Sequence, residues 1–155
     1  MDLTYRPRRL RRTNSLREMV RENTVSASDF IYPLFVHEGS DTQEIAAMPG
    51  TSRWPIDGLI DEVKRAWNLG IRCVVIFPKV PDEQKTEDGA ECFNEKGLIP
   101  RTIERLKKEI PEMCVMTDVA LDPYSCDGHD GIVSDDGIIL NLSLIHISEP
   151  TRQLA

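Results

Sequence analysis

The short stretch 117–131 contains four carboxylates and a histidine, residue types that can bind a cation or act as a base. Asp118, Asp122 and Asp130 are spaced closely enough to face one another, and His129 stands beside the last of them. Oxygen-rich clusters suit Mg²⁺ or another hard cation, whereas a zinc site would call for several Cys or His ligands. The pattern predicts a site for a hard cation with these aspartates as ligands, and it argues against zinc.

A structural interpretation of the same residues stays open. Aspartate is a common turn residue because its side chain bonds nearby backbone, and Pro123 and Gly128 indicate turns here. A single histidine such as His129 more often makes a structural hydrogen bond than it binds a metal or acts as a base. Spacing alone does not choose between a metal site and capped turns.

Alternating apolar runs and amphipathic stretches must position these side chains. Apolar runs predict strands over 30–36, 73–77 and 113–119, and helical spacing predicts helices over 57–70 and 98–110. We expect the last strand to be buried and central, with the polar groups on its exit loop. The order strand, helix, strand, helix, strand is typical of a parallel sheet, so the fold class is α/β.

Three strands and two helices fit half of a barrel or half of a doubly wound sheet, and the pattern does not separate the two. Both folds place functional loops at the carboxyl ends of the strands. The connection 79–97 is long and polar, which is typical of a functional or mobile loop. The site is therefore expected at this edge of the sheet.

The charge is distributed unevenly along the 155 residues. The net charge is -7, yet residues 1–22 carry about +4 through seven arginines. We predict that residues 1–28 form an arm outside the domain 29–141, with a short helix capped by Asn14 or Ser15. Its single apolar stripe favours contact with a neighbouring subunit, hence a homo-oligomer. Clustered arginines also suit nucleic acid, but an otherwise acidic domain makes nucleic-acid binding the weaker alternative.

The four cysteines show no C-x-x-C spacing, and no secretory leader precedes them. A disulfide framework is therefore not expected, and a reducing cytoplasm fits best. No window approaches the length of a membrane span, so we expect no membrane partner.

Several motifs, in order, resemble porphobilinogen synthase, also called δ-aminolevulinic acid dehydratase. The resemblance covers about Arg6 to Asn141 and is strongest at the aspartate-rich stretch. The motifs are Arg6-Pro7-Arg8-Arg9, Tyr32-Pro33-Leu34-Phe35-Val36, Met48-Pro49-Gly50, Gly89 to Asn94 followed by Gly97-Leu98, Asp118-Val119-Ala120-Leu121-Asp122-Pro123-Tyr124, and Gly128-His129-Asp130-Gly131.

The resemblance implies an enzyme that condenses two 5-aminolevulinate molecules to porphobilinogen in tetrapyrrole biosynthesis. It implies a TIM (β/α)8 barrel, here incomplete with about three βα units, and an arm that embraces a neighbour in a homo-octamer. Zinc-dependent members carry cysteines where this sequence has Ala120, Asp122 and Asp130, so the sequence resembles the aspartate-rich, Mg²⁺-associated type. Asp118 matches an active-site carboxylate, and His129 matches a histidine beside the metal loop.

The resemblance also has limits. The two Schiff-base lysines of the family lie on later strands, and no lysine here stands at a matching position, so we expect the chain by itself to be inactive. Residues 142–155 resemble translated sequencing adapter and are expected to be non-native. The rival interpretation is a non-catalytic Mg²⁺-binding or assembly module. A plastid origin stays open beside the cytoplasmic one.

A barrel interrupted after its third strand would leave one parallel edge unpaired. We expect the inward faces of Ile76, Phe77 and Val115 to be exposed at that opening. Open apolar edges promote aggregation, so the isolated chain is expected to fold poorly.

Overall fold

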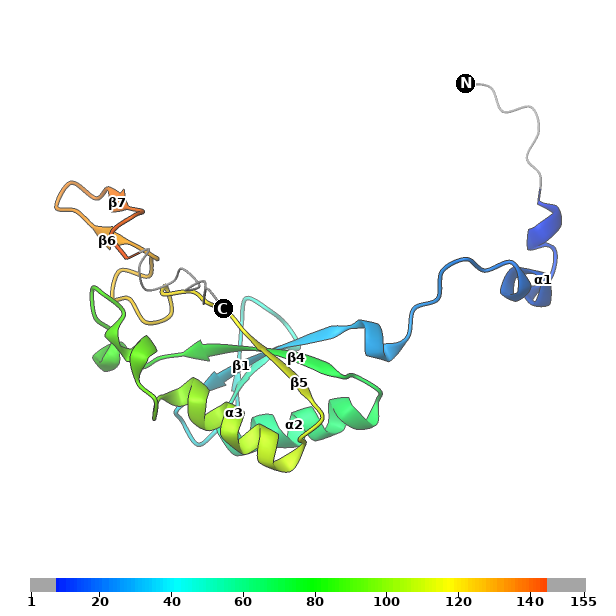
Figure 1. Ribbon diagram of the computed structural model, residues 1–155, viewed down its shortest axis with the longest axis horizontal. Helices are drawn as coiled ribbons and strands as arrows, with labels where there is room; N and C mark the ends of the chain where they lie inside the picture. The colour runs from blue at the N-terminus through cyan, green and yellow to red at the C-terminus, as the bar shows by residue number, and fades with distance from the viewer. Residues whose placement is uncertain (1–7, 145–155) are drawn as a thin grey trace, which may run out of the picture.

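The computed structural model describes residues 8–144, and they form an open α/β sheet with an extended N-terminal arm (Figure 1). They contain three α-helices, seven strands and four short 3-10 helices. In chain order the elements are η1 (Arg9–Arg11), α1 (Asn14–Met19), η2 (Ala27–Asp29), β1 (Ile31–His37), β2 (Gln43–Glu44), β3 (Ser52–Trp54), α2 (Ile56–Asn68), β4 (Cys73–Lys79), η3 (Asp82–Gln84), η4 (Ala90–Phe93), α3 (Leu98–Glu109), β5 (Cys114–Thr117), β6 (Ile132–Val133) and β7 (Ile139–Leu140).

The main sheet has five strands in the order β2-β3-β1-β4-β5. β1 pairs in parallel with both β3 and β4, and β4 pairs in parallel with β5. Only β2 runs antiparallel, against β3. The predicted α/β class is confirmed, and the parallel strands bring their carboxyl ends to one edge, where residues 37, 54, 79 and 117 end the four strands.

α2 and α3 lie side by side and cover one face of this sheet (Figure 1). Their sequences explain their limits. α2 follows Pro55 and stops before Gly70, whose φ of 97° suits glycine. In the last turn of α3, Lys107 donates through Nζ to the carbonyls of Pro111 and Met113, both at 2.8 Å. Both predicted helices are confirmed within two residues at each end.

The core lies between the helices and the sheet. Val74 and Ile76 of β4 are fully buried there, as are Leu59 and Val63 of α2 and Leu106 of α3. Burying side chains of this size contributes about 1.5–3 kcal/mol each. The expectation that Ile76 would be exposed is wrong, because residues alternate along a strand and Ile76 points toward the helices.

Val115 of β5 also packs against this core, so it too faces the helices rather than the open side. Phe77 lies on the opposite face, half-buried, with its ring 5.5 Å from that of Phe35. Of the three residues expected on the open face, only Phe77 lies there. Strand periodicity of two, counted from Ile76, puts Phe77 on the other face.

The prediction that 113–119 is a buried central strand is wrong for the part of the chain that the structure describes. β5 covers only Cys114–Thr117, lies at the sheet edge and is largely exposed. The apolar run resembles a buried strand because strands flanked on both sides carry such residues. Among the described residues, β5 pairs only with β4, so its other edge has no neighbouring strand.

The sequence pattern did not predict β2 and β3. Each has only two or three residues, too few to show an alternation. Their pairing decides their conformation: Phe35 of β1 is in register with Arg53, and Val36 with Trp54. These strands extend the sheet beyond β1 and make it wider than the predicted three strands.

The arm reaches away from the sheet (Figure 1). Its helix α1 is capped by Thr13, whose Oγ1 accepts the Leu16 N–H at 3.2 Å, and not by Asn14 or Ser15 as predicted. Leu10, Met19 and Val25 are each more than half exposed. The described arm thus carries apolar side chains that its own domain does not cover.

The described chain ends just after the hairpin β6–β7, inside the segment 142–155. Asn141 to Leu144 continue from the hairpin β6–β7, and Leu144 is buried. The remaining part of the 142–155 segment lies outside the described residues, so its interpretation stays a prediction. Within residues 8–144, no helix is both long and apolar enough to cross a membrane.

Candidate functional site

A cavity of about 320 Å³ opens at the carboxyl ends of β4 and β5. Three segments enclose it: the strand ends with Ile76, Thr117 and Asp118, the segment 91–100 around the start of α3, and the loop 119–124. Parallel strands bring loops together at this edge, which is where α/β proteins bind ligands. The structure therefore places a cavity at the predicted edge.

Asp118 follows β5 directly and lines this cavity, together with Ala120. Its side chain is exposed, so the carboxylate is accessible to a ligand. Asp122, His129 and Asp130 are exposed residues of the following loop and lie outside the cavity lining. The predicted residues therefore divide between the cavity and the loop beside it.

Asp130 stabilises the loop beside the cavity. One carboxylate oxygen, Oδ1, accepts the backbone N–H of Leu121 at 2.6 Å and that of Asp122 at 3.0 Å. Leu121 is buried, so its N–H needs a partner within the protein. The structural interpretation of the aspartates holds for Asp130, which fixes the chain nine residues before it.

The aspartates are also close enough to influence one another. Partial desolvation by the surrounding loop, followed by the negative charges of Asp130 and Asp118, raises the pKa of the Asp122 carboxyl. A bound cation would relieve that repulsion, and the oxygen-only donor set has the chemistry that Mg²⁺ prefers. Within residues 8–144, however, no three His, Cys, Asp or Glu side chains converge closely enough to hold a metal.

The sequence prediction missed the other wall of the cavity. Glu91, Cys92 and Asn94 line it from the segment around η4, and Tyr124 lines it from the loop after β5. Burial, with smaller contributions from Asp88 and Glu91, raises the pKa of the Cys92 thiol. Two signals in the sequence pointed to this wall without giving its residues a role: the unusual length of the polar connection 79–97 and the family motif from Gly89 to Asn94.

Backbone contacts join this connection to the loop after β5. Thr86 donates its N–H to the Tyr124 carbonyl at 3.2 Å and accepts the Cys126 N–H at 3.1 Å. Ser125, between them, is almost fully buried. Burial, and then the nearby Cys92 and Glu91, raises the pKa of the Tyr124 phenol. The two loops thus form one unit around the cavity.

Comparison with known proteins gives a consistent result. The family model described as delta-aminolevulinic acid dehydratase matches residues 4–153. The chain is 51% identical over 146 residues to the chloroplastic delta-aminolevulinic acid dehydratase of Selaginella martensii, and 53% identical over 143 residues to that of Physcomitrium patens. These alignments cover 93% and 91% of the chain, but only 35% and 33% of the relatives.

A solved structure agrees with these relatives. It is the crystal structure of delta-aminolevulinic acid dehydratase from Toxoplasma gondii ME49 in complex with the reaction product porphobilinogen. The two folds superpose with a TM-score of 0.87 at 44% identity, over 94% of this chain and 42% of the other. The described α/β sheet is therefore an incomplete TIM barrel, and the chain belongs to the delta-aminolevulinic acid dehydratase family.

Proposed function

We propose that the chain is part of a porphobilinogen synthase, which condenses and dehydrates two molecules of 5-aminolevulinate to porphobilinogen. The observation that carries the proposal is Asp118, which ends a parallel strand and opens into the cavity of a chain that belongs to this family. The chain spans about a third of the length of the curated relatives. The activity therefore requires the later strands that carry the two Schiff-base lysines of the family.

In this proposal the described residues bind and orient the substrate. Asp118 is an accessible carboxylate that can hold the ammonium group of 5-aminolevulinate or accept a proton from it. Asn94 supplies an amide from the opposite wall segment, and Leu98 and Ile99 add apolar surface that excludes water. The 155-residue chain alone is expected to form no porphobilinogen.

The test compares two aspartates in the complete protein to which this chain is proposed to belong. Asp118→Asn keeps the size of the side chain but removes its charge and basicity, so porphobilinogen formation should fall at least about a hundredfold. The matched control is Asp61→Asn, which changes an exposed aspartate of α2 away from the cavity. Equal rates in the two variants would contradict the role of Asp118.

We propose Mg²⁺, rather than zinc, as the metal of the complete protein. The proposal is supported by the carboxylates of Asp118, Asp122 and Asp130, which lie near one another on the loop after β5. His129 is an exposed neighbour. Calorimetric titration of the complete protein should show Mg²⁺ binding that Asp122→Asn weakens, and the absence of binding heat with the unsubstituted protein would contradict the proposal. Binding without catalysis in the complete protein would instead favour the Mg²⁺-binding or assembly module.

We further propose that the arm assembles the protein into a homo-oligomer, an octamer as the family resemblance implies. The support is the set of uncovered apolar side chains on the described arm. Removing residues 1–28 from the complete protein should reduce the number of subunits in the assembly, given by the sedimentation molar mass divided by the mass of one chain. An unchanged number of subunits would contradict assembly through the arm.

For the compartment, the names of the similar relatives favour a plastid over the cytoplasm predicted from the cysteines. The four free cysteines agree with a reducing compartment and do not distinguish the two. A fluorescent fusion of the complete protein would distinguish the two locations.

A further inference from the structure

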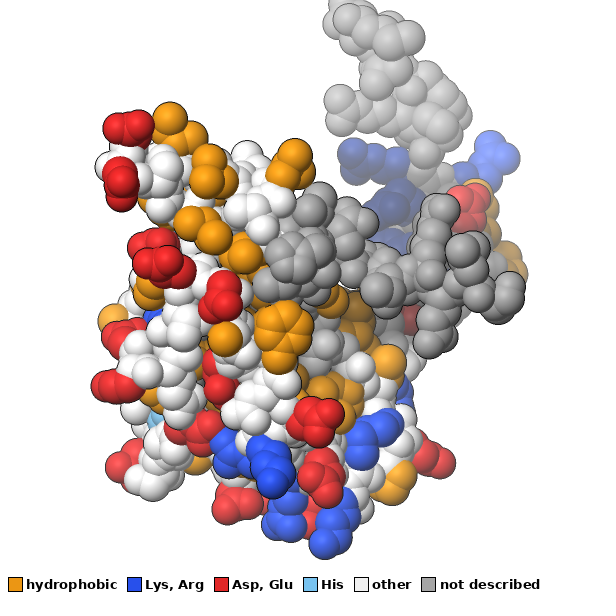
Figure 2. Space-filling model, turned by 60° about the vertical axis from the view of Figure 1, so that its left-hand side comes forward, with side chains coloured by type: hydrophobic (Ala, Val, Ile, Leu, Met, Phe, Trp, Pro, Cys, Tyr) orange, Lys and Arg blue, Asp and Glu red, His pale blue; other side chains and the backbone are white. Residues whose placement is uncertain are grey.

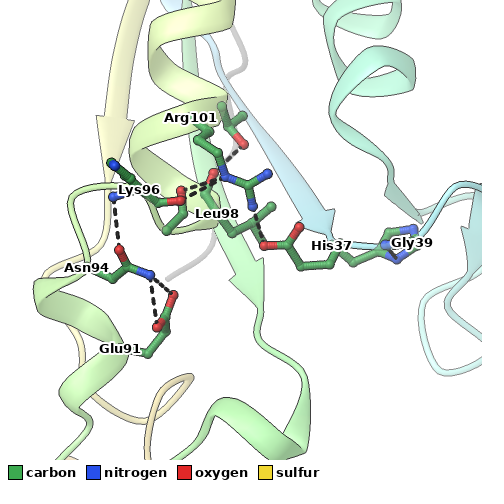
Figure 3. Close-up of polar contacts among 10 residues, drawn as sticks. His37, Gly39, Glu91, Asn94, Lys96, Leu98 and Arg101 are labelled. Atoms are coloured by element: carbon green, nitrogen blue, oxygen red, sulfur yellow. Dashed lines mark hydrogen bonds and ion pairs between the residues drawn. The ribbon is translucent and has the colours of Figure 1, made fainter.

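Arg101, in the first turn of α3, connects two loops that are far apart in the sequence. Its guanidinium forms an ion pair with Glu38, which directly follows β1. Its Nε donates to the carbonyls of Lys96 at 2.9 Å and Gly97 at 3.3 Å. Figure 3 shows Arg101 between the loop after His37 and the segment that leads into α3.

The hydrogen bonds continue from Lys96 toward the cavity. The Lys96 N–H donates to Oδ1 of Asn94 at 3.0 Å, and Nδ2 of Asn94 donates to both carboxylate oxygens of Glu91 at 3.0 and 3.2 Å (Figure 3). Glu91 and Asn94 line the cavity that Asp118 also lines. A continuous series of polar contacts therefore leads from Glu38 to the cavity wall.

Gly97 allows this wall to pack closely. A Cβ at this position would lie 2.9 Å from the Asn94 carbonyl oxygen and 3.0 Å from Oε1 of Glu91. The segment 91–97 contains only one 3-10 turn, so its position depends on such local contacts and on Arg101 rather than on a sheet or a long helix.

Hydrogen bonds hold the turn at the other end of the ion pair. His37, the residue before Glu38, is 5% exposed and is held on both ring nitrogens. Nε2 is 2.9 Å from the Asp41 carbonyl, and Nδ1 accepts the Gly39 N–H at 3.0 Å. Glu38 therefore presents its carboxylate to Arg101 from a turn that these hydrogen bonds hold.

We propose that Arg101 is a positioning residue of the candidate site, which holds the cavity wall 91–97 against the carboxyl end of β1. It acts through the backbone carbonyls of Lys96 and Gly97, and its own side chain does not line the cavity. The identity of the ligand in that cavity rests on the proposed function, but the positioning role does not.

Arginine suits this role better than lysine. The planar guanidinium donates from several nitrogens at fixed angles, so it can bind two carbonyls and a carboxylate at once. A lysine ammonium keeps the charge but cannot reproduce that arrangement. Arg101→Lys should therefore release the wall while it leaves the net charge unchanged.

The first measurement is hydrogen exchange of the complete protein to which this chain is proposed to belong, resolved for the segment 91–97. In Arg101→Lys, exchange of the amides of Asn94, Lys96 and Gly97 should accelerate about three- to tenfold, as expected for the loss of one net hydrogen bond. Glu38→Gln should give a smaller acceleration, because the bonds from Nε remain. In both variants α2 should exchange as before.

The matched control is Arg105→Lys, one turn further along α3. Arg105 is about as exposed as Arg101, and it lies 3.8 Å from Asp57 and 3.6 Å from Glu109, away from the cavity. The variant Arg105→Lys should leave hydrogen exchange in the segment 91–97 unchanged. Equal exchange in Arg101→Lys and Arg105→Lys would overturn the proposal, and so would faster exchange throughout the chain, which would indicate a general structural role.

A second measurement detects the cavity wall directly through Cys92. In the complete protein with every cysteine except Cys92 changed to serine, Cys73, Cys114 and Cys126 included, the pH profile of Cys92 alkylation reports the environment of this thiol. Arg101→Lys should move the profile to lower pH, because a released wall is less buried, and Arg105→Lys should not move it. An unmoved profile in Arg101→Lys would overturn the proposal, and neither measurement depends on substrate turnover.

Discussion

At the scale of single residues, Asp130 combines two properties that substitution can separate. Its Oδ1 accepts the N–H groups of Leu121 and Asp122, and its charge helps to raise the pKa of Asp122. Asp130→Asn keeps an acceptor oxygen but loses the charge, whereas Asp130→Ala loses both. Alanine should therefore destabilise the loop by about 1–3 kcal/mol, the cost of leaving the N–H of the buried Leu121 unpaired, and asparagine by less.

Hydrogen exchange at Leu121 and Asp122 would measure this difference. Asp127→Ala provides the control, since Asp127 is an exposed aspartate of the same loop. Similar protection at Leu121 in Asp130→Ala and Asp127→Ala would show that the carboxylate does not hold the turn.

Glu62 is a buried carboxylate with a different task. It accepts the Tyr32 hydroxyl at 2.7 Å and the Arg65 Nε at 2.8 Å. The hydrogen bonds from Arg65, opposed by burial, lower the pKa of the Glu62 carboxyl. A lowered folded-state pKa contributes stability that is present above the unfolded value of about 4.3 and is lost as the pH falls through the folded value.

We therefore expect Glu62→Gln to reduce the free energy of unfolding at pH 7 by about 1–2 kcal/mol, toward the lower value because Arg65 is 62% exposed. The variant should lose less stability than the parent between pH 5 and pH 3. Urea titrations across this range would measure both effects. Glu104→Gln, at an exposed position of α3, serves as the control, and a parallel pH dependence in parent and Glu62→Gln would contradict the assignment.

At the scale of elements, the two helices stabilise the sheet through a few fully buried side chains. Leu106 of α3 is 0% exposed, whereas Leu69, just after α2, is 64% exposed. Leu106→Ala should lower the free energy of unfolding by about 2–5 kcal/mol, because a cavity adds to the lost transfer energy. Leu69→Ala makes the same chemical change and should cost under about 0.5 kcal/mol. Denaturant midpoints would compare them, and equal costs would contradict the described core.

At the scale of the whole molecule, the sheet has one covered face and one open face. Exposed apolar side chains include Ile31 at 50% and Met116 at 44%, and Met116 lies on the edge strand β5. Figure 2 shows hydrophobic side chains between acidic ones on the side of the molecule that it presents. An unpaired edge with such side chains is a template for association between chains.

The isolated chain should therefore self-associate as its concentration rises. Met116→Lys places a charge on the edge strand and should reduce light scattering at a given concentration. Leu69→Lys adds the same charge at an exposed position outside this edge and should have little effect. A molar mass from light scattering that stays constant as the concentration of the unsubstituted chain rises would contradict the expectation.

The sequence by itself determined the elements whose patterns are long enough to be distinctive. Both long helices, the strands β1 and β4 and the α/β class follow from side-chain periodicity and from residues such as Gly70 that end helices. The motif around Asp118 also indicated the edge of the sheet at which the cavity lies. These features are local, so neighbouring residues in the chain are enough to specify them.

Tertiary structure decided what depends on partners distant in the chain. β2 and β3 exist through pairing with β1, and the burial of Ile76 depends on which sheet face the helices cover. Glu91 and Cys92 line the cavity because of tertiary contacts, which the spacing of residues in the sequence does not predict. Asp130 likewise binds backbone nine residues earlier, because folding brings together groups whose separation along the chain carries no periodic signal.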